Sequence, residues 1–126
     1  MKPRVMFDTG ALIALERRDR AMQVVFRLAT ETAHPPVVTT PVVAEWWRSG
    51  RREKERASLL RALLVEAPNV HVAKLAGVAV GRMFATIVDV LVVVSASIRG
   101  DIVYTSDVPD LERLAEVFPN VEIVRV

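Results

Sequence analysis

The 126-residue sequence contains no cysteine and only two histidines. Without cysteine there is no disulfide framework, no thiolate zinc site and no cysteine nucleophile. The lack of thiols suits a reducing compartment, and we expect the protein to be cytoplasmic. His34 and His71 lie outside any serine–histidine pairing, and the sequence has no glycine-rich phosphate loop. These absences exclude several common catalytic designs.

A long uninterrupted apolar run is also missing. The best candidate covers residues 83–98, but Asp89 interrupts it. A membrane-spanning helix needs about 20 apolar residues, and a carboxylate near its middle is costly. We therefore expect a buried core helix here and no membrane partner. The N-terminus offers few apolar residues before Asp8, so we also expect no signal peptide.

What the chain does have is a high hydrophobic content, 52% of its residues. This content excludes intrinsic disorder. The length suits one compact unit, and no repeat, low-complexity stretch or linker divides it. We expect residues 1–126 to form a single domain.

The hydrophobic pattern predicts five short strands that alternate with helices. Strands are expected at 4–7, 37–39, 70–72, 102–104 and 121–126, and helices at 10–16, 21–32, 41–48, 52–65, 75–84, 88–98 and 109–117. Thr40 is expected to cap the third helix, with Pro41 at its first position. Such alternation predicts an α/β domain with a mostly parallel sheet.

The small net charge of +2 hides an uneven distribution. Residues 48–61 carry six basic and two acidic side chains, whereas residues 62–126 carry five basic and eight acidic ones. The basic segment is either a solvated helix face, with Glu53 and Glu55 paired to nearby arginines, or a contact surface for a polyanion. The charge pattern alone leaves both interpretations open.

Two aspartates occupy equivalent positions after predicted strands. Asp8 follows the first strand, and Asp107 follows the strand at 102–104. Ligands of open parallel sheets gather at the carboxyl ends of strands. The alternative is that each aspartate caps the next helix, although Thr9 could cap in place of Asp8.

Two further carboxylates lie within predicted helices. Asp89 stands in an apolar helix, where an ionised carboxylate needs a cation, hydrogen bonds or a solvent-filled cleft. The alternative for Asp89 is a helix N-cap. Glu45 shares a helix face with the apolar Val42, and its alternative role is a partner of the helix dipole.

Together these four carboxylates could converge on one edge of the sheet. Carboxylates held that closely repel one another unless cations neutralise them, and an all-oxygen site favours Mg²⁺ or Mn²⁺ over zinc. Such a site suits the hydrolysis of phosphodiesters. The basic segment would then help to hold a polyanionic substrate.

The same residues resemble those of the PIN-domain ribonucleases, in particular the VapC-type toxins of bacterial toxin–antitoxin pairs. The resemblance spans nearly the whole chain and rests on VMFDTGALIAL at 5–15, TPVVAE at 40–45, the helix headed by Asp89, and VYTSDVPDL at 103–111. It implies a three-layer α/β/α sandwich, RNA as substrate, Mg²⁺ or Mn²⁺ as cofactor, a homodimer and a VapB-type antitoxin.

By the same resemblance, the catalytic and metal-binding acids would be Asp8, Glu45, Asp89 and Asp107. Thr105 and Ser106 match the hydroxyl pair that orients the last acid or a water. As contacts for RNA or antitoxin, we expect the arginines of the basic segment, namely Arg48, Arg51, Arg52 and Arg56.

Some positions depart from the family pattern or fall outside it. Val92, Val93 and Val94 replace a run that is usually rich in alanine. Trp46 and Trp47 are unusual after the glutamate; we expect core or dimer packing, with a base-stacking or antitoxin-contact platform as the alternative. Asp101 is expected in a surface turn outside the site.

Three other interpretations compete. The Asp8-Thr9-Gly10 triplet matches retroviral-type aspartic proteases, but their fold is nearly all β. Haloacid dehalogenase-type phosphatases need a second aspartate two residues after the first, and here that residue is Gly10. The non-enzymatic alternative is a catalytically idle domain that binds RNA or a partner.

Overall fold

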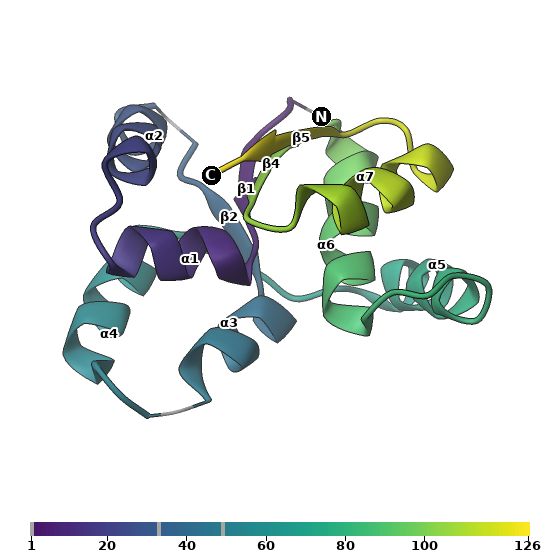
Figure 1. Cartoon of the computed structure of the whole chain (residues 1–126), viewed down its shortest axis with the longest axis horizontal. Helices are drawn as coiled ribbons and strands as arrows, with labels where there is room; N and C mark the ends of the chain where they lie inside the picture. The colour runs from purple at the N-terminus through teal and green to yellow at the C-terminus, as the bar shows by residue number, and fades with distance from the viewer. Residues whose placement is uncertain (1, 33, 49) are drawn as a thin grey trace.

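Five parallel strands form the centre of the molecule (Figure 1). A computed structural model describes residues 2–32, 34–48 and 50–126. The strands are β1 (Val5–Phe7), β2 (Val37–Thr39), β3 (Leu64–Glu66), β4 (Ile102–Thr105) and β5 (Glu122–Arg125). Their order is β3-β2-β1-β4-β5, and every neighbouring pair is parallel. The sheet therefore grows first to one side of β1 and then to the other, which places its switch point between β1 and β4.

Helices cover both faces of this sheet. They are α1 (Thr9–Glu16), α2 (Arg20–Thr30), α3 (Thr40–Trp47), α4 (Glu53–Arg61), α5 (Val70–Val80), α6 (Ile87–Arg99) and α7 (Val108–Val117). Figure 1 shows α1 to α4 on one side of the sheet and α5 to α7 on the other. The predicted three-layer α/β/α architecture is confirmed.

The core lies between the sheet and its helices, and α6 is its most deeply buried helix. All residues from Val90 to Ala96 are buried, which confirms the core helix expected there. On the sheet side, Met6, Phe7 and Val103 are fully buried. Within the described ranges, no helix combines the length and hydropathy that crossing a bilayer would require.

The segment between α4 and α6 differs from the prediction. The helix expected at 52–65 ends at Arg61, and residues 64–66 form β3, which pairs with β2. The strand expected at 70–72 is wrong, because these residues form the first turn of α5. Asn69 starts that turn by accepting a hydrogen bond from the amide of Val72 at 2.9 Å. The Asn69 cap favours a helix at residues 70–72, and pairing with β2 favours a strand at residues 64–66. Local preferences alone do not separate the two conformations.

The start of α3 also differs by one residue. Thr39, not Thr40, occupies the N-cap position with an extended backbone, and Thr40 and Pro41 begin the helix. Proline is tolerated at either of the first two helical positions, because the amides there donate no hydrogen bond within the helix. A Thr-Thr-Pro sequence therefore leaves the cap uncertain by one residue.

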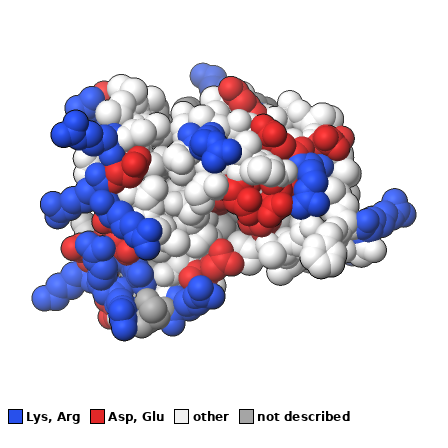
Figure 2. Space-filling model, viewed as in Figure 1, with Lys and Arg blue, Asp and Glu red and all other residues white. Residues whose placement is uncertain are grey.

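Charged side chains are unevenly distributed over the face shown in Figure 2. Basic side chains gather over α2, α4 and the connection from α3 to α4, whereas acidic side chains gather in the middle, between α3 and α7. The segregation expected from the sequence thus persists in three dimensions.

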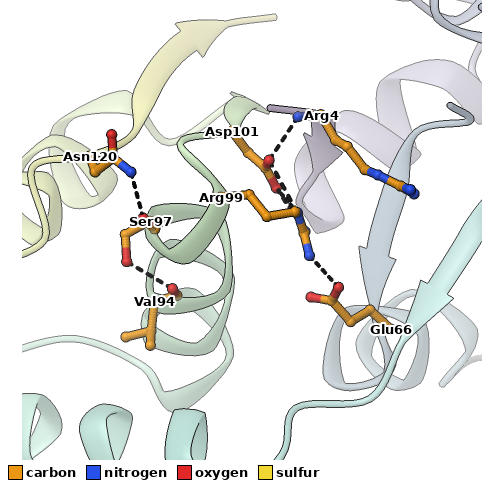
Figure 3. A network of polar contacts seen from close by, with 7 residues as sticks. All are labelled: Arg4, Glu66, Val94, Ser97, Arg99, Asp101 and Asn120. Carbon is orange, nitrogen blue, oxygen red and sulfur yellow. Dashed lines mark hydrogen bonds and ion pairs between the residues drawn. The ribbon is translucent and has the colours of Figure 1, made fainter. Parts of the chain in front are cut away.

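Asp101 corrects another expectation, because it is fully buried and does not lie in a surface turn. Its carboxylate accepts a hydrogen bond from the amide of Arg4 at 2.8 Å and two from Arg99, at 3.0 Å from Nε and 2.7 Å from Nη2 (Figure 3). Arg99 also donates from Nη1 to Glu66 at 2.5 Å. This network joins the amino ends of β1 and β4 to β3.

Replacing Asp101 by alanine should lower the free energy of unfolding by about 3–5 kcal/mol, because it leaves Arg99 with a largely buried and partly unpaired charge. Urea denaturation followed by circular dichroism measures the change. The control is Asp110→Ala, which removes an exposed ion pair with Arg113 and should leave the midpoint nearly unchanged. Equal effects of the two substitutions would contradict a structural role for the network.

Candidate metal centre

A pocket of about 560 Å³ opens at the carboxyl ends of β1 and β4, where the strand order reverses. All four predicted carboxylates line this pocket, which we call the carboxylate pocket: Asp8, Glu45, Asp89 and Asp107. They come from the β1–α1 turn, α3, α6 and the β4–α7 turn. The fold thus brings together residues that are up to 99 positions apart in the chain.

Asp8 is the most buried of the four, with 4% of its surface exposed. Its Oδ1 accepts a hydrogen bond from the amide of Ala11 at 2.9 Å, so it caps α1. Its Oδ2 accepts a hydrogen bond from the Thr105 hydroxyl. Burial raises the pKa of Asp8 despite these bonds, and the charge of Asp107 raises it further. Capping and lining the pocket are therefore compatible roles for one carboxylate.

Thr105 connects two of the acids. Besides donating to Asp8, its Oγ1 accepts a hydrogen bond from the amide of Asp107 at 2.8 Å. Thr105 is fully buried on β4, whereas Ser106 is exposed and lines the pocket. The two predicted hydroxyls thus have different positions, and Thr105 is the one that orients the carboxylate of Asp8.

Asp89 lies in the first turn of α6, but it is not the cap. Thr86 caps this helix, because its hydroxyl accepts a hydrogen bond from the amide of Asp89 at 3.3 Å. Burial raises the pKa of Asp89 to about 6, and the charges of Asp8, Asp107 and Glu45 raise it as well. The four carboxylates therefore lie close enough to repel one another.

Glu45 and Asp107 complete the acidic lining. Glu45 lies beyond the first turn of α3, which removes the helix-dipole interpretation, and it accepts a hydrogen bond from the Thr9 hydroxyl at 2.5 Å. Asp107 is exposed at the N-terminus of α7. Slight burial and the neighbouring Asp110 raise the pKa of Asp107.

Gly10 is a residue of this site whose importance the sequence pattern did not show. A Cβ atom at Gly10 would lie 2.0 Å from Oγ and 2.9 Å from Cβ of Ser106. Only glycine lets α1 approach the β4–α7 turn this closely. The close approach places Asp8 beside Asp107.

The donor set suits a hard divalent cation. It consists entirely of carboxylate oxygens, which Mg²⁺ and Mn²⁺ prefer, and a cation would offset both the burial and the repulsion that raise the pKa of Asp89. Among the residues that the structure describes, no group of three or more histidine, cysteine, aspartate or glutamate side chains is already arranged to hold a metal ion. The carboxylates line the walls of the pocket, and their chemistry fits the predicted metal.

The predicted arginines divide into two groups. Arg48 and Arg56 line the carboxylate pocket, whereas Arg52 bonds to Glu55 at 2.5 Å, which is the local pairing expected for a solvated helix face. Arg51 is exposed. Arg56 is largely buried, and its Nε donates to Glu16 at 2.5 Å. Some arginines of the basic segment thus pair with nearby glutamates, and two arginines of the segment, Arg48 and Arg56, line the carboxylate pocket.

The tryptophan pair packs beside this wall. Trp46 is 3% exposed, as expected for core packing, and its ring meets Trp47 edge to face with centroids 5.9 Å apart. The guanidinium of Arg56 lies 5.8 Å from the Trp46 ring centroid, within the range of a cation–π contact. Trp46 therefore supports the arginine that faces the carboxylates.

Comparison with known proteins gives a match in structure but not in sequence. No family model and no curated protein matches the chain. A chain of the DNA-bound VapBC complex from Salmonella typhimurium matches with a TM-score of 0.75 and 17% identity, over 98% of each chain. A chain of VapBC2 from Rickettsia felis, bound to a DNA fragment from its promoter, gives 0.71 and 14% over 97% of this chain and 98% of that one.

VapC20 from Mycobacterium tuberculosis, a toxin that cleaves the sarcin–ricin loop, matches with a TM-score of 0.65 and 17% identity. The match covers 86% of this chain and 93% of that one. The chain has a PIN-like fold. At these low identities it is the fold that the proteins share, so the activity must be argued from the carboxylates themselves.

A PIN-like fold decides against the protease interpretation of Asp8-Thr9-Gly10. Retroviral-type aspartic proteases are nearly all β, whereas here five parallel strands alternate with helices. Gly10 has a packing role instead, against Ser106. The aspartate ends a strand of an α/β sheet, which is the position at which such sheets bind their ligands.

Asp89→Asn should stabilise the metal-free protein at pH 7. A carboxylate whose folded pKa is about 6, above its ordinary value of 3.8, binds its proton more tightly in the folded state, so stability falls as the pH rises from about 4 to 6. The asparagine variant lacks this loss. In the presence of a chelator, its Tm should exceed that of the wild type by a few degrees at pH 7, and the two should converge near pH 4.

Thermal unfolding followed by circular dichroism at both pH values measures this difference. Added Mg²⁺ should raise the Tm of the wild type and reduce the gap, because a bound ion stabilises the folded state. A gap of equal size at pH 4 and pH 7 would show that the ionisation of Asp89 is not its cause.

Proposed function

We propose that the chain is a Mg²⁺- or Mn²⁺-dependent endoribonuclease and the toxin of a VapBC-type toxin–antitoxin pair. The observation that carries the proposal is the convergence of Asp8, Glu45, Asp89 and Asp107 on one pocket at the switch point of a PIN-like fold. A neighbour with this fold, VapC20, cleaves the sarcin–ricin loop. Helix capping by Asp8 does not require three further carboxylates nearby, and their mutual repulsion supports a role in binding a cation.

The four carboxylates would hold the metal. A divalent cation bound there would acidify a water molecule and neutralise charge on the phosphate and the departing oxygen. The protein's own hydroxyls fix the acids: Thr105 holds Asp8, and Thr9 holds Glu45. Preset carboxylates need no rearrangement when substrate arrives, which lowers the cost of reaching the transition state.

RNA is the substrate class that we propose for this pocket. Arg48 and Arg56 stand on the wall beside the acids, where a guanidinium can neutralise phosphates next to the one that is cleaved. The ion pair with Glu16 and the ring of Trp46 hold Arg56 in a fixed orientation. The pocket thus combines sites for metal with sites for phosphate.

The proposed partners are a VapB-type antitoxin that blocks this pocket and a second copy of the chain. The neighbours from Salmonella typhimurium and Rickettsia felis are VapBC complexes. For the homodimer, α5 offers an exposed apolar face that includes Val70 and Val78, which are 71% and 57% exposed. Burial of such side chains against a second copy would favour association.

The alternative is a domain of the same fold that binds RNA or a partner without cleaving. The intact carboxylate pocket favours catalysis, because binding a polyanion alone gains nothing from four acids at the contact site. Cleavage assays separate the two possibilities.

Asp8→Asn should reduce metal-dependent cleavage of structured RNAs to background. Asparagine still caps α1, so the fold should survive while the metal loses a charged ligand. Cleavage of a panel of structured RNAs is followed by gel electrophoresis while Mg²⁺ or Mn²⁺ is titrated.

A matched control for this substitution is Asp19→Asn. Asp19 caps α2 in the same way, through the amide of Met22 at 3.0 Å, and lies outside the carboxylate pocket. It should cleave like the wild type. Cleavage without metal, or full activity of Asp8→Asn, would contradict the proposed chemistry.

Arg48→Gln should weaken RNA binding and make it less sensitive to salt. Each phosphate contact that is lost lowers the slope of log K against log salt concentration by about 1. Fluorescence anisotropy in the Asp8→Asn background, between low and physiological salt, measures the slope. The control is Arg27→Gln, a change at an exposed position on α2. An unchanged slope for Arg48→Gln would show that Arg48 makes no contact with an RNA phosphate.

A further inference from the structure

A second hollow, of about 520 Å³, adjoins the carboxylate pocket. The two share Thr86 and Asp89. From there the second hollow extends between the α5–α6 turn and α7, where Arg113 lines its far side. We call it the side hollow. The shared residues make the two pockets neighbours, so one RNA strand could occupy both.

Phe84 stands at the rim of the side hollow and is 96% exposed, the highest value for a large apolar side chain in the part of the chain that the structure describes. Its neighbours Met83 and Ala85 pack against the core. The backbone of the turn is closed by hydrogen bonds from the amide of Met83 to Ala79 at 2.9 Å and from that of Ala85 to Met83 at 3.1 Å. The turn therefore holds the ring outward.

We propose that Phe84 is a stacking platform for a base of the RNA substrate, next to the phosphate at the carboxylates. The inference rests on the proposed function. An exposed phenyl ring offers an apolar face on which any base can stack. Arg113 lines the same hollow from α7 and is paired with Asp110, but its side chain is 53% exposed, so its guanidinium can also meet the backbone of the same nucleotide.

The charged lining of the side hollow favours RNA over a second copy of the chain. Asp89, Asp110 and Arg113 line it together with the apolar residues. An apolar protein segment that filled it would desolvate Asp89 and the exposed ion pair between Asp110 and Arg113, which is costly. A nucleotide brings a flat base for the ring and a phosphate for the arginine, and it leaves the carboxylates open to a cation.

Binding of a fluorescein-labelled single-stranded RNA to Asp8→Asn protein, with and without Phe84→Leu, tests the platform. Leucine keeps the apolar character but lacks the ring face, so the Kd should rise about 5- to 100-fold, whereas Phe84→Trp should retain the affinity. Leu28→Ala, an exposed apolar change on α2 outside both hollows, should have no effect.

An abasic scan makes the test specific to stacking. One abasic position in the RNA should weaken binding to the Phe84 protein and cause no further loss in the Phe84→Leu protein. In Mg²⁺, the single variant Phe84→Leu should raise KM more than it lowers kcat. An unchanged Kd, additive abasic effects, or a change of oligomeric state in Phe84→Leu would overturn the proposal; the last result would assign the ring to a protein contact.

These measurements also separate this inference from the proposed function. Metal-dependent cleavage with an unchanged Kd for Phe84→Leu overturns the platform alone. Binding that depends on Phe84 in a wild type without cleavage supports the platform and overturns the nuclease. A wild type that binds none of the RNAs overturns both.

Discussion

The hydroxyl of Thr105 donates to Asp8 and accepts from the amide of Asp107, and much of the site depends on these two hydrogen bonds. The first bond joins the end of β1 to β4, the strand pair at which the two halves of the sheet meet, and the second lies within the β4–α7 turn. Without this donor, the buried Asp8 would be left with its bonds to the backbone of Ala11 and Gly10 as compensation for the loss of water. The bond from the amide of Asp107 to Thr105 holds the N-cap residue of α7. Gly10 permits this arrangement, because any side chain there would meet Ser106.

The carboxylate pocket costs the folded protein stability, and the rest of the molecule offsets that cost. Burial and like charges raise the pKa of Asp89 to about 6, so near neutral pH the folded state holds an ionised group that its surroundings disfavour. At the amino ends of the strands, Asp101 and Arg99 do the opposite, because each buried charge there has a partner. The core around α6 provides apolar burial between the two. The protein tolerates the unfavourable charges of the carboxylate pocket because its stabilising contacts lie elsewhere.

The fold class could be predicted from local pattern, whereas the choice of the four acids also needed the resemblance to PIN-domain ribonucleases. Asp8 and Asp107 follow short apolar strands, a position that suits both a ligand-binding edge and a helix cap, so the local pattern left the choice open. The location of β3 could not be predicted in the same way, since residues 64–66 become a strand only by pairing with β2. The burial of Asp101 depends on Arg99 and on the backbone of Arg4, which are partners that no local pattern shows. Contacts between distant segments were therefore the unpredictable part.

The basic segment shows how one stretch of sequence serves both folding and binding. Its charge could have been spread over solvent, yet Arg56 turns inward to Glu16 and Trp46 and reaches the wall of the carboxylate pocket. An arginine held in this way loses little freedom when it meets a phosphate, so more of its interaction energy remains available for binding. The acids repel a polyanion at long range, and the fixed cations beside them, together with the metal ion that we propose, would oppose that repulsion at close range. For the RNA substrate that we propose, the positions of the charges matter more than their total of +2.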